Sequence, residues 1–158
     1  YTAGVRYEKN EILDKRIKII KTNRGGKITL HNPGQKIVYF VIDLNNKKKD
    51  IRKFITVIEN SIIKFLNLYK IKSKADKDRI GIWVKNKKIA AIGVRVTKWI
   101  AYHGCSINVC NNLSQYKKII PCGLDNSNIT SIKKEGVHLI KNVDKNLKKI
   151  FYQMLDEF

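Results

Sequence analysis

The sequence has little proline, glycine and cysteine, and it lacks long apolar runs. Its 158 residues include two prolines, nine glycines and three cysteines. No apolar stretch approaches the roughly 20 residues that a membrane-spanning helix needs, and no charged-then-apolar leader with a small-residue cleavage site opens the chain. Internal repeats and linker-like segments are also absent. We therefore predict one folded domain over residues 1–158, with no membrane-spanning helix and no membrane partner.

The three cysteines, Cys105, Cys110 and Cys122, are an odd number in a chain with no secretory leader. Small secreted domains use sets of paired cysteines as disulfide frameworks. We therefore expect reduced thiols in a cytosol-like compartment. His103 and the cysteines lack the paired short spacing of structural zinc ligands, so no metal site is predicted.

Acidic residues are scarce, with 13 against 33 basic residues and a net charge of +20. Dense positive charge is typical of nucleic-acid-binding domains. However, 27 of the basic residues are lysines and six are arginines, whereas readers of bases and phosphates favour arginine. The lysines are scattered among many asparagines and isoleucines, a combination that AT-biased coding produces without selection for a site. An acidic protein partner, attracted by the positive field, is the third explanation.

The hydrophobic fraction of 43% is sufficient for a packed core. β-branched and aromatic residues predict strands over residues 16–21, 27–31, 36–44, 80–84, 88–96 and 99–109. Residues 36–44 are expected to be buried on both faces, and residues 80–84 and 88–96 to pair as a hairpin. The last predicted strand is expected to be interrupted at His103-Gly104.

Two long amphipathic helices are predicted. The first covers about 20 residues after Asp50, a suitable N-cap, and has apolar residues at helical spacing from Ile51 to Leu66. The second has a similar stripe from Val143 to Phe158, and a short helix is expected near residues 113–118. Clustered strands with flanking helices predict an α/β or α+β domain built on a mixed sheet.

Cys122 lies between Pro121 and Gly123. Proline fixes φ and glycine allows close backbone approach, so this tripeptide predicts an irregular turn. Such a turn can expose a thiol and direct backbone N–H groups at a developing oxyanion. The alternative is a buried packing cysteine, since free cysteine is among the most buried residue types. Cys105 and Cys110 have no comparable context and are predicted to be packing residues.

Two further segments combine small and polar residues. Gly25 and Gly26 follow Arg24 and leave room for a ligand beside the main chain, although an ordinary loop between strands is the alternative. Lys88 opens a strand with the small residues Ala90, Ala91 and Gly93, which suit a cavity wall. The alternative for Lys88 is a solvated surface lysine.

Six motifs together resemble the octanoyltransferase family in order and spacing. They are RGGKITLH (24–31), NPGQ (32–35), GIWVKNKKIAAIGVRV (81–96), YHG..IN (102–108), PCG (121–123) and the Thr130-Ser131 pair. The resemblance runs from Tyr1 to about Ser131. It does not include the opening segment of the family, so we expect an N-terminally truncated catalytic domain.

The resemblance implies a fold similar to the catalytic domain of biotin and lipoate protein ligases, and a two-step acyl transfer that uses no cofactor. An octanoyl or lipoyl group moves from acyl carrier protein to Cys122. It then moves to a lysine on a lipoyl domain of a 2-oxoacid dehydrogenase or on the H protein of glycine cleavage. The expected location is the cytoplasm, or the matrix or stroma of a lipoylating organelle.

The resemblance also implies roles for single residues. Cys122 carries the acyl thioester, and Lys88 lowers the pKa of that thiol. The residues implied to line the acyl site are Arg24, Gly25, Gly26, Lys27, Ile28, Thr29, Leu30, His31, Ala91, Ile92, Gly93, Gly104, Cys105 and Ser106. Two of these, Cys105 and Ser106, replace small apolar residues of the family.

Three rival interpretations remain from the sequence. An ATP-dependent lipoate–protein ligase shares the fold but has no PCG nucleophile. A basic nucleic-acid-binding domain would explain the charge. A non-catalytic remnant would explain the missing opening segment.

Overall fold

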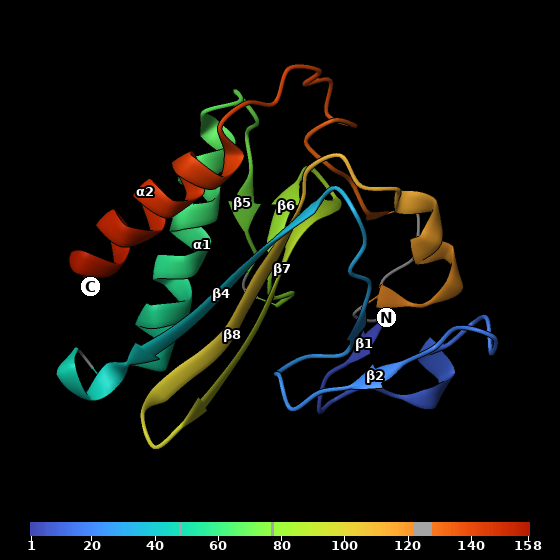
Figure 1. The fold of residues 1–158 in the computed structure, drawn as a ribbon, viewed down its shortest axis with the longest axis horizontal. Helices are drawn as coiled ribbons and strands as arrows, with labels where there is room; N and C mark the ends of the chain where they lie inside the picture. The colour runs from blue at the N-terminus through green and yellow to red at the C-terminus, as the bar shows by residue number, and fades with distance from the viewer. Residues whose placement is uncertain (48, 77, 122–127) are drawn as a thin grey trace.

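The computed structural model describes residues 1–158 except residues 48, 77 and 122–127. Within this part of the chain, the main sheet has five strands in the order β4-β8-β7-β6-β5, and every neighbouring pair is antiparallel (Figure 1). The strands are β4 (Gln35–Asp43), β5 (Lys74–Ala75), β6 (Ile82–Val84), β7 (Lys87–Thr97) and β8 (Ile100–Asn108).

A smaller three-stranded sheet has the order β2-β1-β3. It is built from β1 (Thr2–Ala3), β2 (Ile20–Lys21) and β3 (Ile28–Thr29). β1 runs parallel to β2 and antiparallel to β3. The mixed pairing expected from the sequence is therefore found in the small sheet, while the described main sheet is antiparallel.

Helices α1 (Ile51–Asn67) and α2 (Val143–Asp156) pack against each other on one side of the main sheet (Figure 1). Asp50 caps α1, because its Oδ1 accepts a hydrogen bond from the Lys53 N–H at 2.9 Å. Both predicted helices and this cap are confirmed. Phe158 lies beyond the end of α2 but is still buried in the core.

Two apolar clusters stabilise the fold. The larger one joins the helices to the main sheet through fully buried side chains such as Phe54, Ile58 and Ile107. The smaller one contains Ile28, Leu30, Tyr116, Ile119 and Ile129. It fixes the small sheet to the segment around the 3₁₀-helix η3 (Leu113–Lys118), which confirms the short helix predicted there.

Two further 3₁₀-helices, η1 (Lys9–Glu11) and η2 (Leu44–Asn46), complete the secondary structure of the described residues. The predicted hairpin is confirmed, with Trp83 opposite Lys88 in the β6–β7 pair. Within the described chain, no helix is both long and apolar enough to cross a membrane. The α+β class with sheets and flanking helices is confirmed.

Three details of the strand predictions are wrong. β4 is not buried on both faces, because it is an edge strand and its Tyr39 and Val41 are 73% and 75% exposed. β8 is not interrupted at His103-Gly104, because β4 and β7 pair with it over that stretch. Of the strand predicted over residues 16–21, only Ile20–Lys21 forms a strand.

Candidate active site

A cavity of about 350 Å³ lies between the small sheet and the face of the main sheet opposite the helices. Small residues from β7 and β8 form its floor. Ala91 faces Ser106, and Gly93 faces Gly104, in alternate cross-strand pairs of one register. Since successive side chains of a strand point to opposite faces, these residues share the cavity side. Their small size leaves room above the sheet.

Gly104 cannot be replaced by a larger residue without moving the sheet. A Cβ atom there would lie 1.8 Å from the carbonyl oxygen of Val38 on β4. The preceding residue, His103, has a φ of +68°, in the left-handed region. The backbone of β8 is therefore distorted beside the cavity while its ladder remains continuous.

The Arg24-Gly25-Gly26 loop closes the cavity from the opposite side. The Arg24 guanidinium donates hydrogen bonds to the Thr2 carbonyl at 2.8 Å and to the Gly25 carbonyl at 2.9 Å. A Cβ on Gly25 would lie 2.7 Å from the Val94 carbonyl oxygen, so glycine allows this loop to lie directly against β7. Lys27 is held in ion pairs with Glu8 and Glu11.

Two histidines border the cavity. The His31 Nδ1–H donates to Gln35 Oε1 at 2.9 Å, and the His103 Nε2–H donates to Asn23 Oδ1 at 2.6 Å. Burial and the Arg24 guanidinium lower the pKa of both histidines. Both imidazoles are therefore neutral at neutral pH.

Lys88 lies on the cavity wall and is only 6% exposed. Its Nζ lies 5.5 Å from the centroid of the Trp83 ring, within the range of a cation–π contact. No carboxylate among the described residues forms an ion pair with this ammonium. Its charge is therefore available to a group in the cavity.

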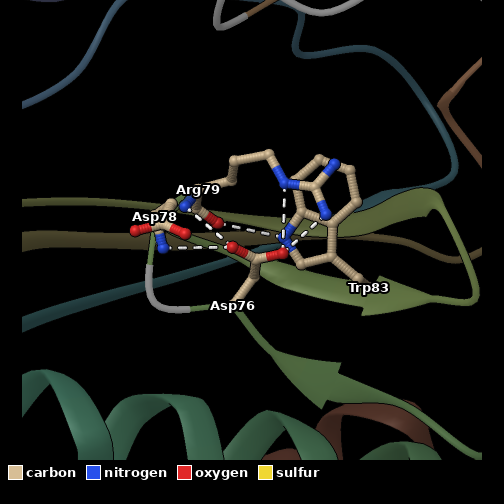
Figure 2. A network of polar contacts seen from close by, with 4 residues as sticks. All are labelled: Asp76, Asp78, Arg79 and Trp83. Atoms are coloured by element: carbon tan, nitrogen blue, oxygen red, sulfur yellow. Dashed lines mark hydrogen bonds and ion pairs between the residues drawn. The ribbon is translucent and has the colours of Figure 1, made fainter.

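The segment before β6 forms a wall that the sequence analysis did not identify (Figure 2). The Asp76 carboxylate accepts hydrogen bonds from the N–H groups of Asp78 and Arg79 and pairs with the Arg79 guanidinium. That guanidinium lies 4.1 Å from the centroid of the Trp83 ring, and the Trp83 indole donates to the Arg79 carbonyl at 3.0 Å. In the sequence, the signal for this wall was the spacing of Asp76 and Arg79, three residues apart, with Trp83 four residues further on.

The structure brings most of the predicted site residues to the cavity. Those that line it are Arg24, Gly26, Lys27, Thr29, His31, Lys88, Ala91, Ile92, Gly93, Gly104, Cys105 and Ser106. The lining residues that the sequence analysis did not assign to the acyl site are Thr2, Arg6, Thr22, Ile37, Tyr39, Asp78, Arg79, Ile80, Trp83 and His103.

Three residues expected at the acyl site do not line the cavity. Ile28 and Leu30 are buried in the smaller apolar cluster, because alternate residues of this segment face away from Thr29. Gly25 packs against the β7 backbone instead. Cys122 lies outside the described residues.

The described cysteines do not provide a reactive thiol at the cavity. Cys105 is buried, and burial raises the pKa of its thiol to about 12, so it stays protonated at neutral pH. Cys110 is exposed and does not line the cavity.

A second, much smaller hollow of about 20 Å³, here termed the inner recess, lies beside Lys88. Its lining residues are Thr29, Lys88, Ala90, Ala91, Ser106, Asn108, Tyr116, Pro121 and Ile129. Ile129 also forms a parallel β-bridge with Lys88, and the Thr130 N–H donates to the Lys88 carbonyl at 2.9 Å. Residues on both sides of the 122–127 segment therefore adjoin Lys88.

Comparison with known proteins gives consistent results. Residues 4–152 match the family model of the lipoyl protein ligase A/B catalytic domain. Over 147 residues the chain is 47% identical to the octanoyltransferase of Rickettsia canadensis, a match that covers 88% of this chain and 70% of that protein.

The fold matches solved ligase structures at low sequence identity. Lipoate-protein ligase A bound with ATP has a TM-score of 0.81 at 14% identity, over 98% of this chain and 68% of that one. A bipartite lipoate protein ligase from Thermoplasma acidophilum, described with its E2 lipoyl domain, has a TM-score of 0.74 at 14% identity, over 98% and 67%. The biotin protein ligase of Aquifex aeolicus has a TM-score of 0.62 at 17% identity, over 79% and 54%. These likenesses establish the fold.

Proposed function

The chain belongs to the octanoyltransferase family, and from that premise we propose that it transfers octanoyl groups to lysine side chains of lipoyl domains. Such an enzyme is an acyltransferase of protein lipoylation. In this proposal Cys122 carries the acyl group as a thioester between two half-reactions. Lys88 stabilises the Cys122 thiolate, donates a proton in the first half-reaction and accepts one in the second.

The observation that carries the proposal is the position of Lys88 at the junction of the cavity and the inner recess. Pro121, the residue before Cys122, lines the same recess. The proposal requires the Cys122 thiol to act next to the Lys88 ammonium. A cation about 4 Å from a thiolate contributes roughly 4 kcal/mol at an effective dielectric constant of about 20. That attraction favours the thiolate, the form of cysteine that attacks.

In the first half-reaction, the Cys122 thiolate attacks the carbonyl carbon of the donor thioester. The carbon–sulfur bond to the donor breaks, and the departing thiolate takes a proton from the Lys88 ammonium. One thioester replaces another, so the energies are nearly balanced and positioning matters more than driving force.

In the second half-reaction, the amine of the acceptor lysine attacks the Cys122 thioester. A lysine has a reference pKa of about 10.4, so it must lose a proton to become a nucleophile. The first proton of the acceptor ammonium goes to solvent, and Lys88, left neutral by the first half-reaction, accepts the second proton, which the amine loses as the amide forms. The Cys122 thiolate leaves, and an amide bond replaces the thioester bond.

The cavity supports an acyl group of medium length. Its volume of about 350 Å³ is near the lower end of the roughly 300–1,000 Å³ of small-molecule sites. Burial of about six methylenes at about 0.8 kcal/mol each would contribute roughly 5 kcal/mol of binding free energy. Ala91 and Gly93 provide the floor along which such a chain would lie.

The proposed donor is octanoyl-acyl carrier protein, an acidic protein, and the net charge of +20 favours its approach. The proposed acceptors are lipoyl domains of 2-oxoacid dehydrogenases and the H protein of glycine cleavage. A lipoyl domain accompanies one of the structurally similar ligases. The proposed location follows these partners: the cytoplasm, or the matrix or stroma of a lipoylating organelle.

Intact-mass measurement tests the proposal directly. We expect octanoyl-acyl carrier protein to add one octanoyl mass to the chain, and hydroxylamine to remove it, because hydroxylamine cleaves thioesters. Cys122→Ser should abolish the hydroxylamine-sensitive label, and Lys88→Ala should slow labelling by orders of magnitude.

Cys105→Ser and Lys87→Ala are the matched controls for these two substitutions, and both should keep the label. A label that persists in Cys122→Ser would contradict the assignment of the nucleophile. Labelling with free octanoate only in the presence of ATP would instead indicate a ligase.

A further inference from the structure

Two residues that border the cavity carry hydroxyl groups without a hydrogen-bond partner among the described residues. Thr29 is 7% exposed and Ser106 is 6% exposed. Neither side chain forms a hydrogen bond with any other residue that the structure describes. Neither oxygen is among the enclosed polar atoms that lack a partner, so both hydroxyls are open to the cavity and can donate to a group bound there.

Thr29 and Ser106 line the acyl cavity and also the inner recess. The only other residues common to both among the described residues are Lys88 and Ala91. The recess therefore opens where the floor of the acyl cavity reaches the Lys88 side chain. Its volume of about 20 Å³ suits one oxygen-sized group, since a single water needs about 10–15 Å³ by the same measure.

Asn108 and Tyr116, two other polar residues of the recess, already have partners. The Asn108 Nδ2 donates to the Thr130 carbonyl at 3.0 Å, and its Oδ1 accepts from Gln35 at 2.9 Å. The Tyr116 hydroxyl donates to the same Oδ1 at 3.4 Å. Besides the Lys88 ammonium, the hydroxyls of Thr29 and Ser106 are thus the side-chain donors of the recess with unused capacity.

We propose that Thr29 and Ser106 form the site for the acyl carbonyl oxygen and donate hydrogen bonds to it as it becomes an oxyanion. The inference rests on the proposed function. When the thiolate adds to the thioester carbonyl, the C–S bond forms and the π electrons move to the oxygen. When the oxygen electrons return to the carbon, the bond to the donor sulfur breaks and the donor thiolate takes the Lys88 proton. The two hydroxyls stabilise the intermediate charge without giving up their own protons.

The two donors differ in origin. Thr29 lies on β3 of the small sheet, and Ser106 lies on β8 of the main sheet. The proposed site therefore joins the two sheets at the Lys88 side of the cavity.

Single-turnover acylation of the whole protein, followed by intact mass at saturating octanoyl-acyl carrier protein, tests these roles. Thr29→Val and Ser106→Ala should each lower the acylation rate constant roughly 100-fold, the lower end of the range seen for loss of one oxyanion donor. The donor concentration for half-maximal rate should stay the same. Thr97→Val, an exposed hydroxyl on β7 outside the cavity, is the matched control and should keep the wild-type rate.

The infrared stretch of a ¹³C-labelled acyl carbonyl gives a second readout that folding alone does not move. Hydrogen bonds to the carbonyl lower its frequency, so the band of the acyl-enzyme should shift to higher frequency in both variants. Unchanged rates and an unchanged band would overturn the inference while leaving the acyl-enzyme intact. If the wild-type protein forms no acyl-enzyme, the proposed function fails instead.

Discussion

Gly81 controls the position of the Lys88 side chain. Its φ is +135°, a conformation that residues with a side chain rarely adopt. A Cβ atom at this position would lie 2.4 Å from Lys88 Cε and 2.6 Å from the Ala90 carbonyl oxygen. The lysine is therefore held between this backbone and the Trp83 ring.

We predict that Gly81→Ala displaces Lys88 and slows acylation strongly, toward the rate of Lys88→Ala. The backbone strain alone should cost about 1–3 kcal/mol of folding free energy. Intact mass gives the acylation rate, and thermal unfolding gives the stability.

Gly136→Ala is the control that separates backbone strain from displacement of the Lys88 side chain. Gly136 also has a positive φ, +91°, but a Cβ atom added there would meet no described residue beyond its chain neighbours within 4 Å. This variant should lose stability through strain and keep its acylation rate. Acylation of Gly81→Ala at the wild-type rate would show that the contact does not position Lys88.

At the scale of the elements, α1 depends on a local cap and on packing against the sheet. Asp50 satisfies the Lys53 N–H, one of the N–H groups that have no partner inside the helix. Buried residues such as Phe54 and Ile58 then join the helix to the larger cluster. The helix supports the side of the main sheet that is opposite the cavity.

We predict that Asp50→Ala destabilises the protein by about 1 kcal/mol, the usual loss for an N-cap. For a chain of this size that corresponds to a fall in Tm of about 2–4 °C. Asp50→Asn is the control, because asparagine caps helices about as well as aspartate. Equal Tm values for the alanine variant and the wild type would show that the cap contributes nothing.

The net positive charge of +20 is a property of the whole molecule. With 33 basic and 13 acidic residues, the protein presents a positive field to any acidic partner. Such fields raise association rates, and salt screens them over a Debye length of about 10 Å at 0.1 M. The effect concerns the encounter with the donor rather than the chemistry at Lys88.

We predict that kcat/KM for octanoyl-acyl carrier protein falls at least about tenfold between roughly 0.01 M and 0.5 M salt. A small neutral octanoyl thioester is the control donor, and its kcat/KM should change little over the same range. An equal salt dependence for both donors would mean that the field does not assist docking.

The family, both helices, the Asp50 cap and the β6–β7 hairpin could all be predicted from the amino-acid sequence. The helices, the cap and the hairpin depend on residues that are close together in the chain, through side-chain periodicity, capping or turn chemistry. The family resemblance also identified most of the residues that line the cavity, including Lys88.

Which faces are buried, in contrast, depends on how distant segments pack. The exposure of Tyr39 follows from the position of β4 at the sheet edge, and the burial of Ile28 follows from packing against the η3 segment. The cavity wall formed by Asp78, Arg79 and Trp83 beside Lys88 required the pairing of β6 with β7. These outcomes rest on contacts between segments far apart in the chain, and no local pattern encodes them.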